Sequence, residues 1–154
     1  MRHQCPGEFY REIVQELCVH FSPDESVDVD EQFYRYLDRC YEADKQALAQ
    51  AGLEGEAPRS VSGVRNGLFI FAVGLLTYGR LDVVEDIVER MPQSGHTRQL
   101  EYVINVLLPL PAGLDPVGDR AGFHEWLCRH KTDLKWNAAK GLFEYDAQSV
   151  PLTR

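Results

Sequence analysis

Apolar residues recur at helical spacing along most of the chain. Phe9, Ile13 and Leu17 repeat every four residues, which places them together on one face of a helix. Similar stripes recur further along the chain, separated by segments rich in proline, glycine or acidic residues. The pattern predicts helices over residues 8–21, 30–51, 62–78, 81–91, 97–108 and 119–130.

Residues that break or cap helices mark the ends of these segments. Pro23 follows the first one, and a residue before proline is held out of the helical region. Asp30 is a candidate N-cap for the second helix, because its carboxylate can accept hydrogen bonds from the first turn. Gly79 is a candidate stop for the third helix. Pro109 and Pro111 end the fifth, because proline cannot continue a helix without losing a hydrogen bond.

The last part of the chain changes its period. Residues 134–136 and 142–145 alternate apolar and polar side chains, which is typical of strands. Gly141 ends the short turn between them, where a hairpin loop often needs a positive φ. An isolated hairpin is marginally stable in water, so Trp136 and Phe143 should cover helix surface. We expect a small C-terminal β-hairpin packed on the helices.

The third predicted helix is apolar nearly all round beyond its first turns, which is typical of a central helix. Gly67 and Gly74 lie on one of its faces, where a neighbouring helix could approach closely. We predict a mainly α protein, a compact bundle of about six helices with a small C-terminal hairpin. A length of 154 residues corresponds to one domain. The predicted domain covers 1–154, with an acidic helical part (8–50), an apolar helical core (62–108) and a tryptophan helix with the hairpin (119–146).

Charge is unevenly distributed along the chain. The 16 Lys and Arg against 24 Asp and Glu give a net charge of −8. This argues against nucleic acid as a partner, because nucleic-acid binders need a basic surface. Residues 1–60 hold 13 acids and 6 bases, a net −7, whereas residues 61–154 hold 11 acids and 10 bases, a net −1. Between His20 and Tyr34 there is no Lys or Arg, and there are five acids: Asp24, Glu25, Asp28, Asp30 and Glu31.

This acidic stretch has two interpretations. It is either a solvated connection or a docking site, since a patch of one sign speeds the capture of an oppositely charged partner. Its spacing lacks the central glycine and terminal glutamate of an EF-hand, which argues against a calcium site. Tyr34 lies beside it with Tyr36 and Tyr41, and exposed tyrosine next to acidic residues is typical of a protein interface. For a docking site, Tyr34 is the expected anchor.

A second acidic group lies on the fourth predicted helix. Its members follow the spacing i, i+3, i+4 and i+7, so they share one helix face: Asp82, Glu85, Asp86 and Glu89. Such a face is most often a solvated surface, because charged residues are rarely buried. These four residues are the second choice for a partner-binding surface.

Motifs for catalysis and metal binding are lacking. No serine lies in a G-x-S-x-G pattern, and no glycine-rich loop follows a predicted strand. His124 and Cys128 lie four residues apart, the spacing at which two side chains can hold one ion, but no further ligand has a matching spacing. The four cysteines form no C-x-x-C pair; we expect reduced thiols, with Cys18, Cys40 and Cys128 on apolar helix faces. The sequence predicts a protein that is not an enzyme and has no cofactor and no metal site.

The chain shows no membrane or export signal. Its first residues lack the apolar segment of a secretory signal. The longest apolar stretch, residues 67–78, has 12 residues, whereas a membrane-spanning helix needs about 20. We expect a cytoplasmic protein without a membrane partner.

The order of segments from residue 61 to 146 resembles a known class of proteins. An apolar helix passes into a short acidic one, and a further apolar helix stops at Pro109-Leu-Pro111. A helix with Glu125-Trp126-Leu127 then precedes Leu134-Lys-Trp-Asn137 and Gly141-Leu-Phe-Glu144. This order is similar to that of small helical cytoplasmic immunity proteins. Those proteins neutralise toxins that bacteria deliver to neighbouring bacteria in interbacterial competition, for example by type VI secretion.

The resemblance implies a role and no specific site residues. It implies that the chain binds a cognate toxin and occludes the active site or substrate channel of that toxin. An acidic surface suits a basic toxin. An acidic chaperone or adaptor for a secreted effector fits the size and charge equally well and is the alternative. An immunity protein would bind a folded toxin domain, whereas a chaperone would bind an extended segment of its client.

Overall fold

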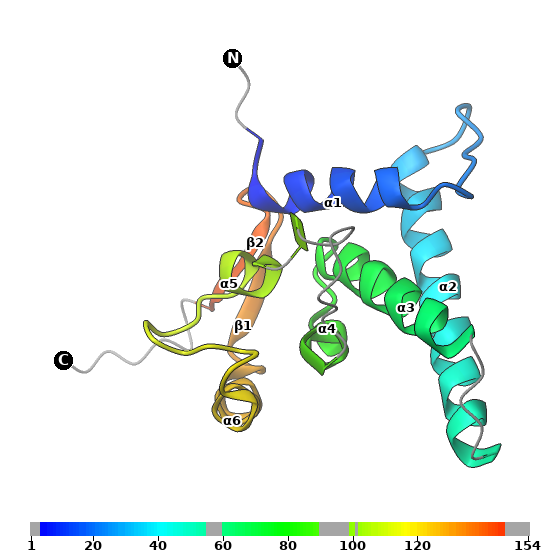
Figure 1. The fold of residues 1–154 in the computed structure, drawn as a ribbon. Coiled ribbons are helices and arrows are strands. Elements are labelled where there is room, and N and C mark those ends of the chain that lie inside the picture. Colours follow the sequence, from blue (N-terminus) through cyan, green and yellow to red (C-terminus); the bar gives the residue numbers. More distant parts are fainter. Residues whose placement is uncertain (1–3, 55–59, 90–98, 101, 147–154) are drawn as a thin grey trace.

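The most apolar helix lies among the other elements of the molecule. The computed structural model describes residues 4–54, 60–89, 99–100 and 102–146. In it, α3 (Ser60–Leu76) is surrounded by other helices (Figure 1). Most side chains between Leu68 and Leu76 are buried. A helix that is apolar on all sides is stable only when other elements cover it. α3 is therefore the central helix of the fold.

Two helices from the N-terminal part pack on α3. α1 (Pro6–Leu17) and α2 (Val29–Glu54) both contact it, and the three helices meet at Gly74. A Cβ at Gly74 would lie 2.8 Å from the side chain of Leu37 in α2 and 3.0 Å from that of Val14 in α1. The close approach predicted for this glycine is therefore confirmed.

A glycine stop ends α3 and positions the arginine that follows. Gly79 has a φ of +92°, and the backbone N–H groups of Gly79 and Arg80 donate to carbonyls of the last turn at 2.9 and 3.2 Å. This pattern is a Schellman motif, and it confirms Gly79 as the stop. The chain continues as a short 3-10 helix, η1 (Leu81–Val83), and then as α4 (Val84–Glu89).

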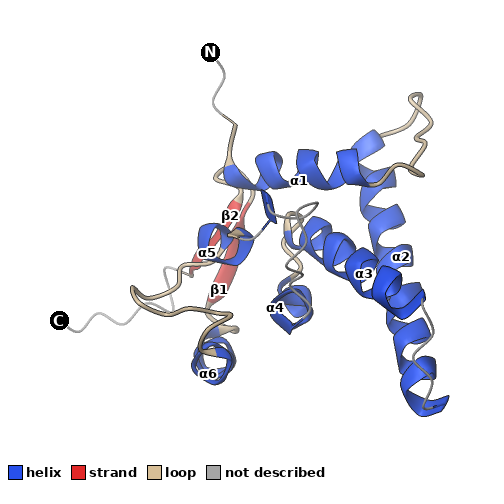
Figure 2. Ribbon diagram, viewed as in Figure 1, coloured by secondary structure: helices blue, strands red, loops and turns tan. Residues whose placement is uncertain are grey.

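The C-terminal third begins with two helices. α5 (Val103–Leu107) contacts α1 and the end of the hairpin. α6 (Arg120–His130) starts after Asp119, whose carboxylate accepts a hydrogen bond from the backbone N–H of Gly122 at 3.0 Å. This cap confirms the predicted start of the sixth helix. Figure 2 shows both helices on the side of the molecule that carries the strands.

The chain then forms the predicted hairpin. β1 (Leu134–Asn137) and β2 (Leu142–Tyr145) pair antiparallel, with Trp136 opposite Phe143. Trp136 covers the glycine stop after α3, since a Cβ at Gly79 would lie 2.9 Å from its ring. Phe143 is buried in the core. The hairpin is therefore packed on the helical part, as predicted.

The described residues form six α-helices, one 3-10 helix and one two-stranded sheet. The predicted fold class is confirmed. The buried apolar side chains form one cluster with members from all six α-helices and from β2. In the part of the chain that the structure describes, every helix is too short or too polar to span a membrane.

The first helix differs from the prediction in both position and orientation. It spans Pro6–Leu17 rather than 8–21, because proline fits the first helical position, where its missing N–H is not needed. Its buried face runs through Tyr10 and Val14, and Phe9 is 48% exposed. Phe9 was expected in the core. The stripe through Phe9 and the stripe one residue later have the same period, and packing on α3 selects the second.

Other helix boundaries also differ from the prediction. α2 begins one residue earlier and ends three residues later than predicted, and α3 is displaced by two residues at each end. The segment predicted as one helix over 81–91 is divided into η1 and α4, and Met91 lies outside the described residues. The fifth helix, predicted over 97–108, is shorter: α5 begins at Val103 and ends at Leu107, and residues 97 and 98 lie outside the described residues.

Candidate functional site

The acidic connection between α1 and α2 forms a hydrogen-bonded turn. The Oδ1 atom of Asp24 accepts hydrogen bonds from the hydroxyl and the backbone N–H of Ser26, at 2.7 and 3.0 Å. These bonds, first the one from the hydroxyl, hold the pKa of Asp24 below its ordinary value. The Gln32 amide of α2 bonds the backbone N–H and carbonyl of Asp24, at 2.9 and 2.7 Å. The turn therefore presents exposed carboxylates from an ordered backbone.

Asp28, rather than Asp30, caps α2. Its Oδ1 atom accepts hydrogen bonds from the backbone N–H groups of Asp30 and Glu31, at 3.0 and 3.3 Å. The prediction of Asp30 as the cap was wrong by two residues, because the helix begins at Val29. Asp30 instead lies in the first turn of α2, where its carboxylate reaches toward α1.

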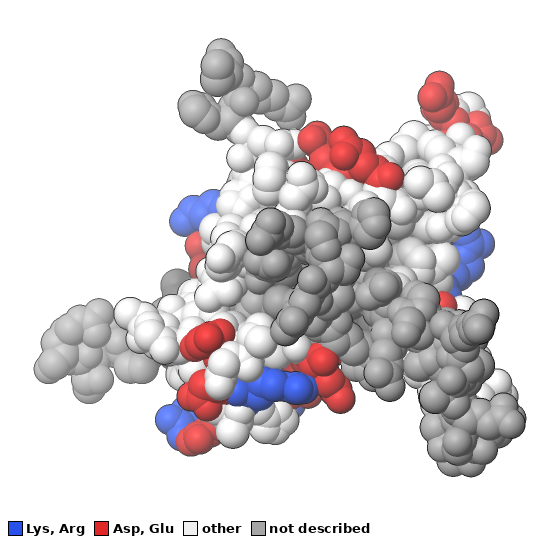
Figure 3. Space-filling view, viewed as in Figure 1, with Lys and Arg blue, Asp and Glu red and all other residues white. Residues whose placement is uncertain are grey.

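The first helix adds carboxylates that the sequence reasoning did not include. Glu8, Glu12 and Glu16 occur at every fourth position and share one face of α1. Figure 3 shows acidic side chains over α1 and over the α1–α2 connection on the same side of the molecule. We define the acidic face as these carboxylates: Glu8, Glu12, Glu16, Asp24, Glu25, Asp28, Asp30 and Glu31.

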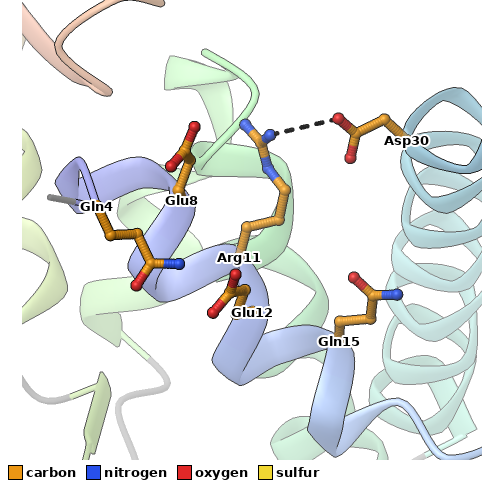
Figure 4. A pocket seen from close by; sticks show the side chains of 6 residues that line it. All are labelled: Gln4, Glu8, Arg11, Glu12, Gln15 and Asp30. Atoms are coloured by element: carbon orange, nitrogen blue, oxygen red, sulfur yellow. Dashed lines mark ion pairs between the residues drawn. The ribbon is translucent and has the colours of Figure 1, made fainter. Parts of the chain in front are cut away.

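A cleft joins the two parts of the acidic face. It lies between α1 and the start of α2 and has a volume of about 450 Å³. Its lining residues are Gln4, Glu8, Arg11, Glu12, Gln15 and Asp30. Figure 4 shows the side chains from Gln4 to Gln15 along α1 and Asp30 at the start of α2, with Arg11 directed across the cleft toward Asp30. The cleft is thus polar, with three carboxylates and one arginine among its lining residues.

Arg11, the one Lys or Arg between residues 4 and 31, is engaged inside the molecule. Its Nη1 atom lies 3.8 Å from Oδ2 of Asp30, and its Nε atom donates to the Thr77 hydroxyl at 3.2 Å. The guanidinium lies 4.0 Å from the centroid of the Tyr78 ring, a cation–π distance. The positive charge of Arg11 therefore offsets the negative charge of Asp30. The contacts of Arg11 with Thr77 and Tyr78 also link α1 to the end of α3.

The other carboxylates have few counter-charges. Glu31 pairs with Arg35 one turn later at 2.7 Å, an exposed pair of the kind worth about 0.3–0.5 kcal/mol. Within the described residues, six members of the acidic face form no ion pair: Glu8, Glu12, Glu16, Asp24, Glu25 and Asp28. Their negative potential is directed to solvent.

Tyr34, predicted as an exposed anchor, is half-buried. Its ring packs edge-on against Tyr78 with centroids 5.2 Å apart, and its hydroxyl accepts a hydrogen bond from Nη1 of Arg80 at 3.2 Å. Tyr36 is also half-buried and Tyr41 is buried. The interpretation of these tyrosines as an exposed interface is therefore wrong, because α2 uses them to pack on α3, on the turn after it and on α4.

Exposed apolar side chains accompany the acidic face instead. Phe9 on α1 is 48% exposed, and Val19 and Val27 in the connection are 78% and 54% exposed. Protein interfaces combine an apolar centre with a polar rim. These three exposed residues are interleaved in the sequence with the carboxylates of the acidic face.

The second acidic group is engaged in contacts with other elements. Arg80 binds Asp82 through Nε and Nη2, at 2.8 and 2.9 Å. These hydrogen bonds hold the pKa of Asp82 below its ordinary value. Arg80 also donates to Asp38 of α2 at 3.1 Å. Arg80 thus links α2 to the segment after α3, and Asp82 accepts the hydrogen bonds from its Nε and Nη2 atoms.

Asp86 and Glu85 also contact distant parts of the chain. The hydroxyl of buried Tyr41 donates to Asp86, and Nζ of Lys45 lies 3.5 Å away. Burial, and then Asp86, raise the pKa of Tyr41, so its hydroxyl remains the donor. Glu85 bonds Nδ1 of His124 in α6, and Glu89 is exposed. Asp82, Glu85 and Glu89 are exposed, as expected of a solvated face. Asp86 is mostly covered, and the contacts of Asp82, Glu85 and Asp86 tie this face to other parts of the fold.

The cysteines are placed differently from one another. Cys18 is buried, and burial raises its pKa to about 12. Cys40 is partly buried, but Cys128 is exposed, so the prediction that Cys128 packs inward was wrong. α6 turns Trp126 and Leu127 toward the core, which leaves position 128 outside. Among the described residues, no three His, Cys, Asp or Glu side chains are arranged to hold a metal ion.

Comparisons of the chain with protein-family models, with curated proteins and with solved structures found no match. The candidate site therefore rests on the charge and geometry of this chain.

The glutamates of α1 could have been found from the sequence, since a repeat of one residue type every fourth position is visible there.

Proposed function

We propose that this chain is a binding protein whose acidic face captures a folded protein with a basic surface. The observation that carries the proposal is the charge between residues 4 and 31, which is eight carboxylates against one arginine. That arginine, Arg11, is turned inward to Asp30 and Thr77. A surface of one sign raises the rate of encounter with an oppositely charged surface and orients the partner.

The resemblance to helical immunity proteins supports a more specific role. On this proposal the partner is a bacterial toxin domain, and the chain acts in the cytoplasm by covering the active site of that toxin. A toxin that acts on nucleic acids or nucleotides needs a basic site for phosphate groups. The carboxylates of the acidic face would occupy the places of those phosphates, and substrate would be excluded.

On the proposal, exposed apolar residues of the same region slow the dissociation of the complex. Charge complementarity mainly sets the association rate, whereas the dissociation rate depends on well-packed, desolvated contacts. Phe9, Val19 and Val27 are large exposed apolar side chains of this region. On the proposal they become buried when the toxin binds.

The test begins with co-expression of this chain and the protein encoded by the adjacent open reading frame. We expect the neighbour to arrest growth, and this chain to restore growth and co-purify with it. The sharpest variant carries Glu12→Lys, Glu16→Lys and Glu25→Lys, since these residues form no ion pair within the described part of the chain. We expect affinity to fall on the order of a hundredfold, because each reversal replaces an attraction with a repulsion.

A matched control changes the net charge equally at positions away from the acidic face. Glu42→Lys, Glu125→Lys and Asp133→Lys together serve this purpose and should leave growth rescue intact. Equal loss of affinity in both triple variants would mean that only net charge matters and would refute the acidic face as the binding site. A harmless neighbour that needs this chain to stay soluble would instead identify a chaperone. Limited proteolysis of the complex would then cleave the client readily, because its bound segment is extended.

A further inference from the structure

Three side chains between α4 and α6 form a hydrogen-bonded series of carboxylate, imidazole and thiol. Glu85 of α4 bonds Nδ1 of His124 in α6. Nε2 of the same ring lies 3.5 Å from Sγ of Cys128. His124 and Cys128 are one helical turn apart and therefore lie on the same face of α6. This order matches a nucleophile, its base and the group that orients the base.

The carboxylate of Glu85 decides which ring nitrogen faces the thiol as an acceptor. A carboxylate accepts hydrogen bonds, so Nδ1 carries the proton of the neutral ring. Nε2 then keeps its lone pair and can accept the proton of the Cys128 thiol. His124 and Glu85 come from different elements, so the hydrogen bond between α6 and α4 orients the base.

The thiol is also accessible to small molecules. Cys128 is the exposed member of the four cysteines, which all lie in the described part of the chain. It lines an open cleft of about 520 Å³ together with Leu81, Leu127 and Lys131. That volume is within the range of small-molecule sites, roughly 300–1,000 Å³. The cleft combines apolar surface with a nucleophile and a base.

We propose that Cys128 is a reactive thiol and that this cleft is a site of thiol–disulfide exchange with a low-molecular-weight disulfide. Nε2 of His124 takes the thiol proton as the Cys128 sulfur attacks one sulfur of the disulfide. A new S–S bond forms as the old one breaks, and the other half leaves as a thiolate. The leaving thiolate takes the proton from the imidazolium of His124. The disulfide is reduced, Cys128 is oxidised to a mixed disulfide, and no other oxidant is needed.

The site is independent of the acidic face and of the role proposed for it. It uses α4 and α6, whereas the acidic face uses α1 and the start of α2. A failure of either proposal therefore leaves the other standing, and the experiments for the two have separate readouts.

The test uses the full chain and oxidised glutathione as the disulfide, with mixed-disulfide formation at each cysteine followed by mass spectrometry. We expect Cys128 to react first. His124→Gln should lower its rate at least about tenfold, because a positioned base contributes of that order or more. Glu85→Gln should lower it less, by roughly threefold, since the amide oxygen still accepts from Nδ1 but the charge that stabilises the imidazolium is lost. His20→Gln and Glu12→Gln, which change an exposed histidine and an exposed glutamate away from α4 and α6, should leave the rate unchanged.

The same rates measured in denaturant serve as a reference that does not depend on the variants being folded. There, Cys128 should react equally in every protein, and folding should raise its rate only in those with an intact His124. A folded wild-type rate no higher than the unfolded rate would overturn the proposal. Equal rates in the wild type and in folded His124→Gln would overturn it too, because Cys128 would then be exposed but not activated. A faster reaction at Cys5 would place the reactive thiol elsewhere.

Discussion

The acidic face and the carboxylates of the η1–α4 segment look alike in the sequence and differ in the structure. In the η1–α4 segment, Asp82 is bound by Arg80 and Asp86 by the buried hydroxyl of Tyr41. On the acidic face, Glu12 and Glu16 form no ion pair with any described residue. Carboxylates of the first kind hold parts of the fold together, whereas those of the second kind face solvent and, on our proposal, are available to a partner.

The difference is caused by partners that are distant in the sequence. Tyr41 lies 45 residues from Asp86, and Arg80 lies 42 residues from Asp38. Their positions depend on how α2 packs along α3 and on the glycine stop that aims Arg80. A charge pattern on one helix therefore shows that a carboxylate is present, and the packing of other helices decides whether it is neutralised.

The largest expected effect separates the two regions by stability. Asp86→Ala should lower the free energy of unfolding by about 2 kcal/mol, because the buried Tyr41 hydroxyl loses its acceptor. Only 16% of the Asp86 side chain is exposed. Glu12→Ala on the acidic face should change the same quantity by less than about 0.5 kcal/mol. Urea denaturation of the two variants measures both.

A second substitution tests the cause of that loss. Tyr41→Phe added to Asp86→Ala removes the unsatisfied hydroxyl and should recover part of the stability. If Asp86→Ala costs no more than Glu12→Ala, the distinction between the two regions does not hold for stability.

A smaller effect, with a pH dependence, is expected at Arg80. Arg80→Met should lower the free energy of unfolding by about 1–2 kcal/mol near neutral pH, since hydrogen bonds to Asp82 and Asp38 are lost at a partly exposed site. Arg80 holds the pKa of Asp82 below its ordinary value. The contribution of Asp82 is therefore complete above the ordinary pKa and is lost as the pH falls through the lowered one.

The difference in the free energy of unfolding between wild type and Arg80→Met should accordingly become smaller as the pH falls below about 4. Denaturant unfolding at a series of pH values from neutral to acidic checks this. A difference that stays constant over the series would show that Arg80 acts by packing alone and that its pairing with Asp82 contributes nothing.

The parts of the fold that local chemistry determines could be predicted from the sequence. Gly79 and Gly141 adopt the positive φ values expected of them, +92° and +65°. Asp119 caps the sixth helix, and the alternating segments at the end of the chain form the hairpin. In each case the deciding residues lie within a few positions of the feature.

The parts of the fold that depend on packing between distant segments could not be predicted from the sequence. The buried stripe of α1 is one residue from the predicted one, because the two stripes have the same period. Tyr34 is covered by Tyr78 and Arg80, and His124 meets a carboxylate 39 residues away. Helical spacing identified His124 and Cys128 as neighbours, but only the fold brings Glu85 to them.

The smallest expected effect has the opposite sign and belongs to the acidic face. Glu12→Gln, Glu16→Gln and Glu25→Gln together should raise the free energy of unfolding slightly, by no more than about 0.5 kcal/mol at low ionic strength. Glu8, Glu12 and Glu16 are like charges at i, i+4 spacing, which destabilise a helix by a few tenths of a kcal/mol per pair. The gain should disappear at high ionic strength, because salt screens exposed charges. Thermal unfolding at two salt concentrations measures this gain.

A loss of stability of more than about 1 kcal/mol would mean that these carboxylates stabilise the fold as those of the η1–α4 segment do. The acidic face would then be a structural surface, and the argument that it exists for a partner would fail.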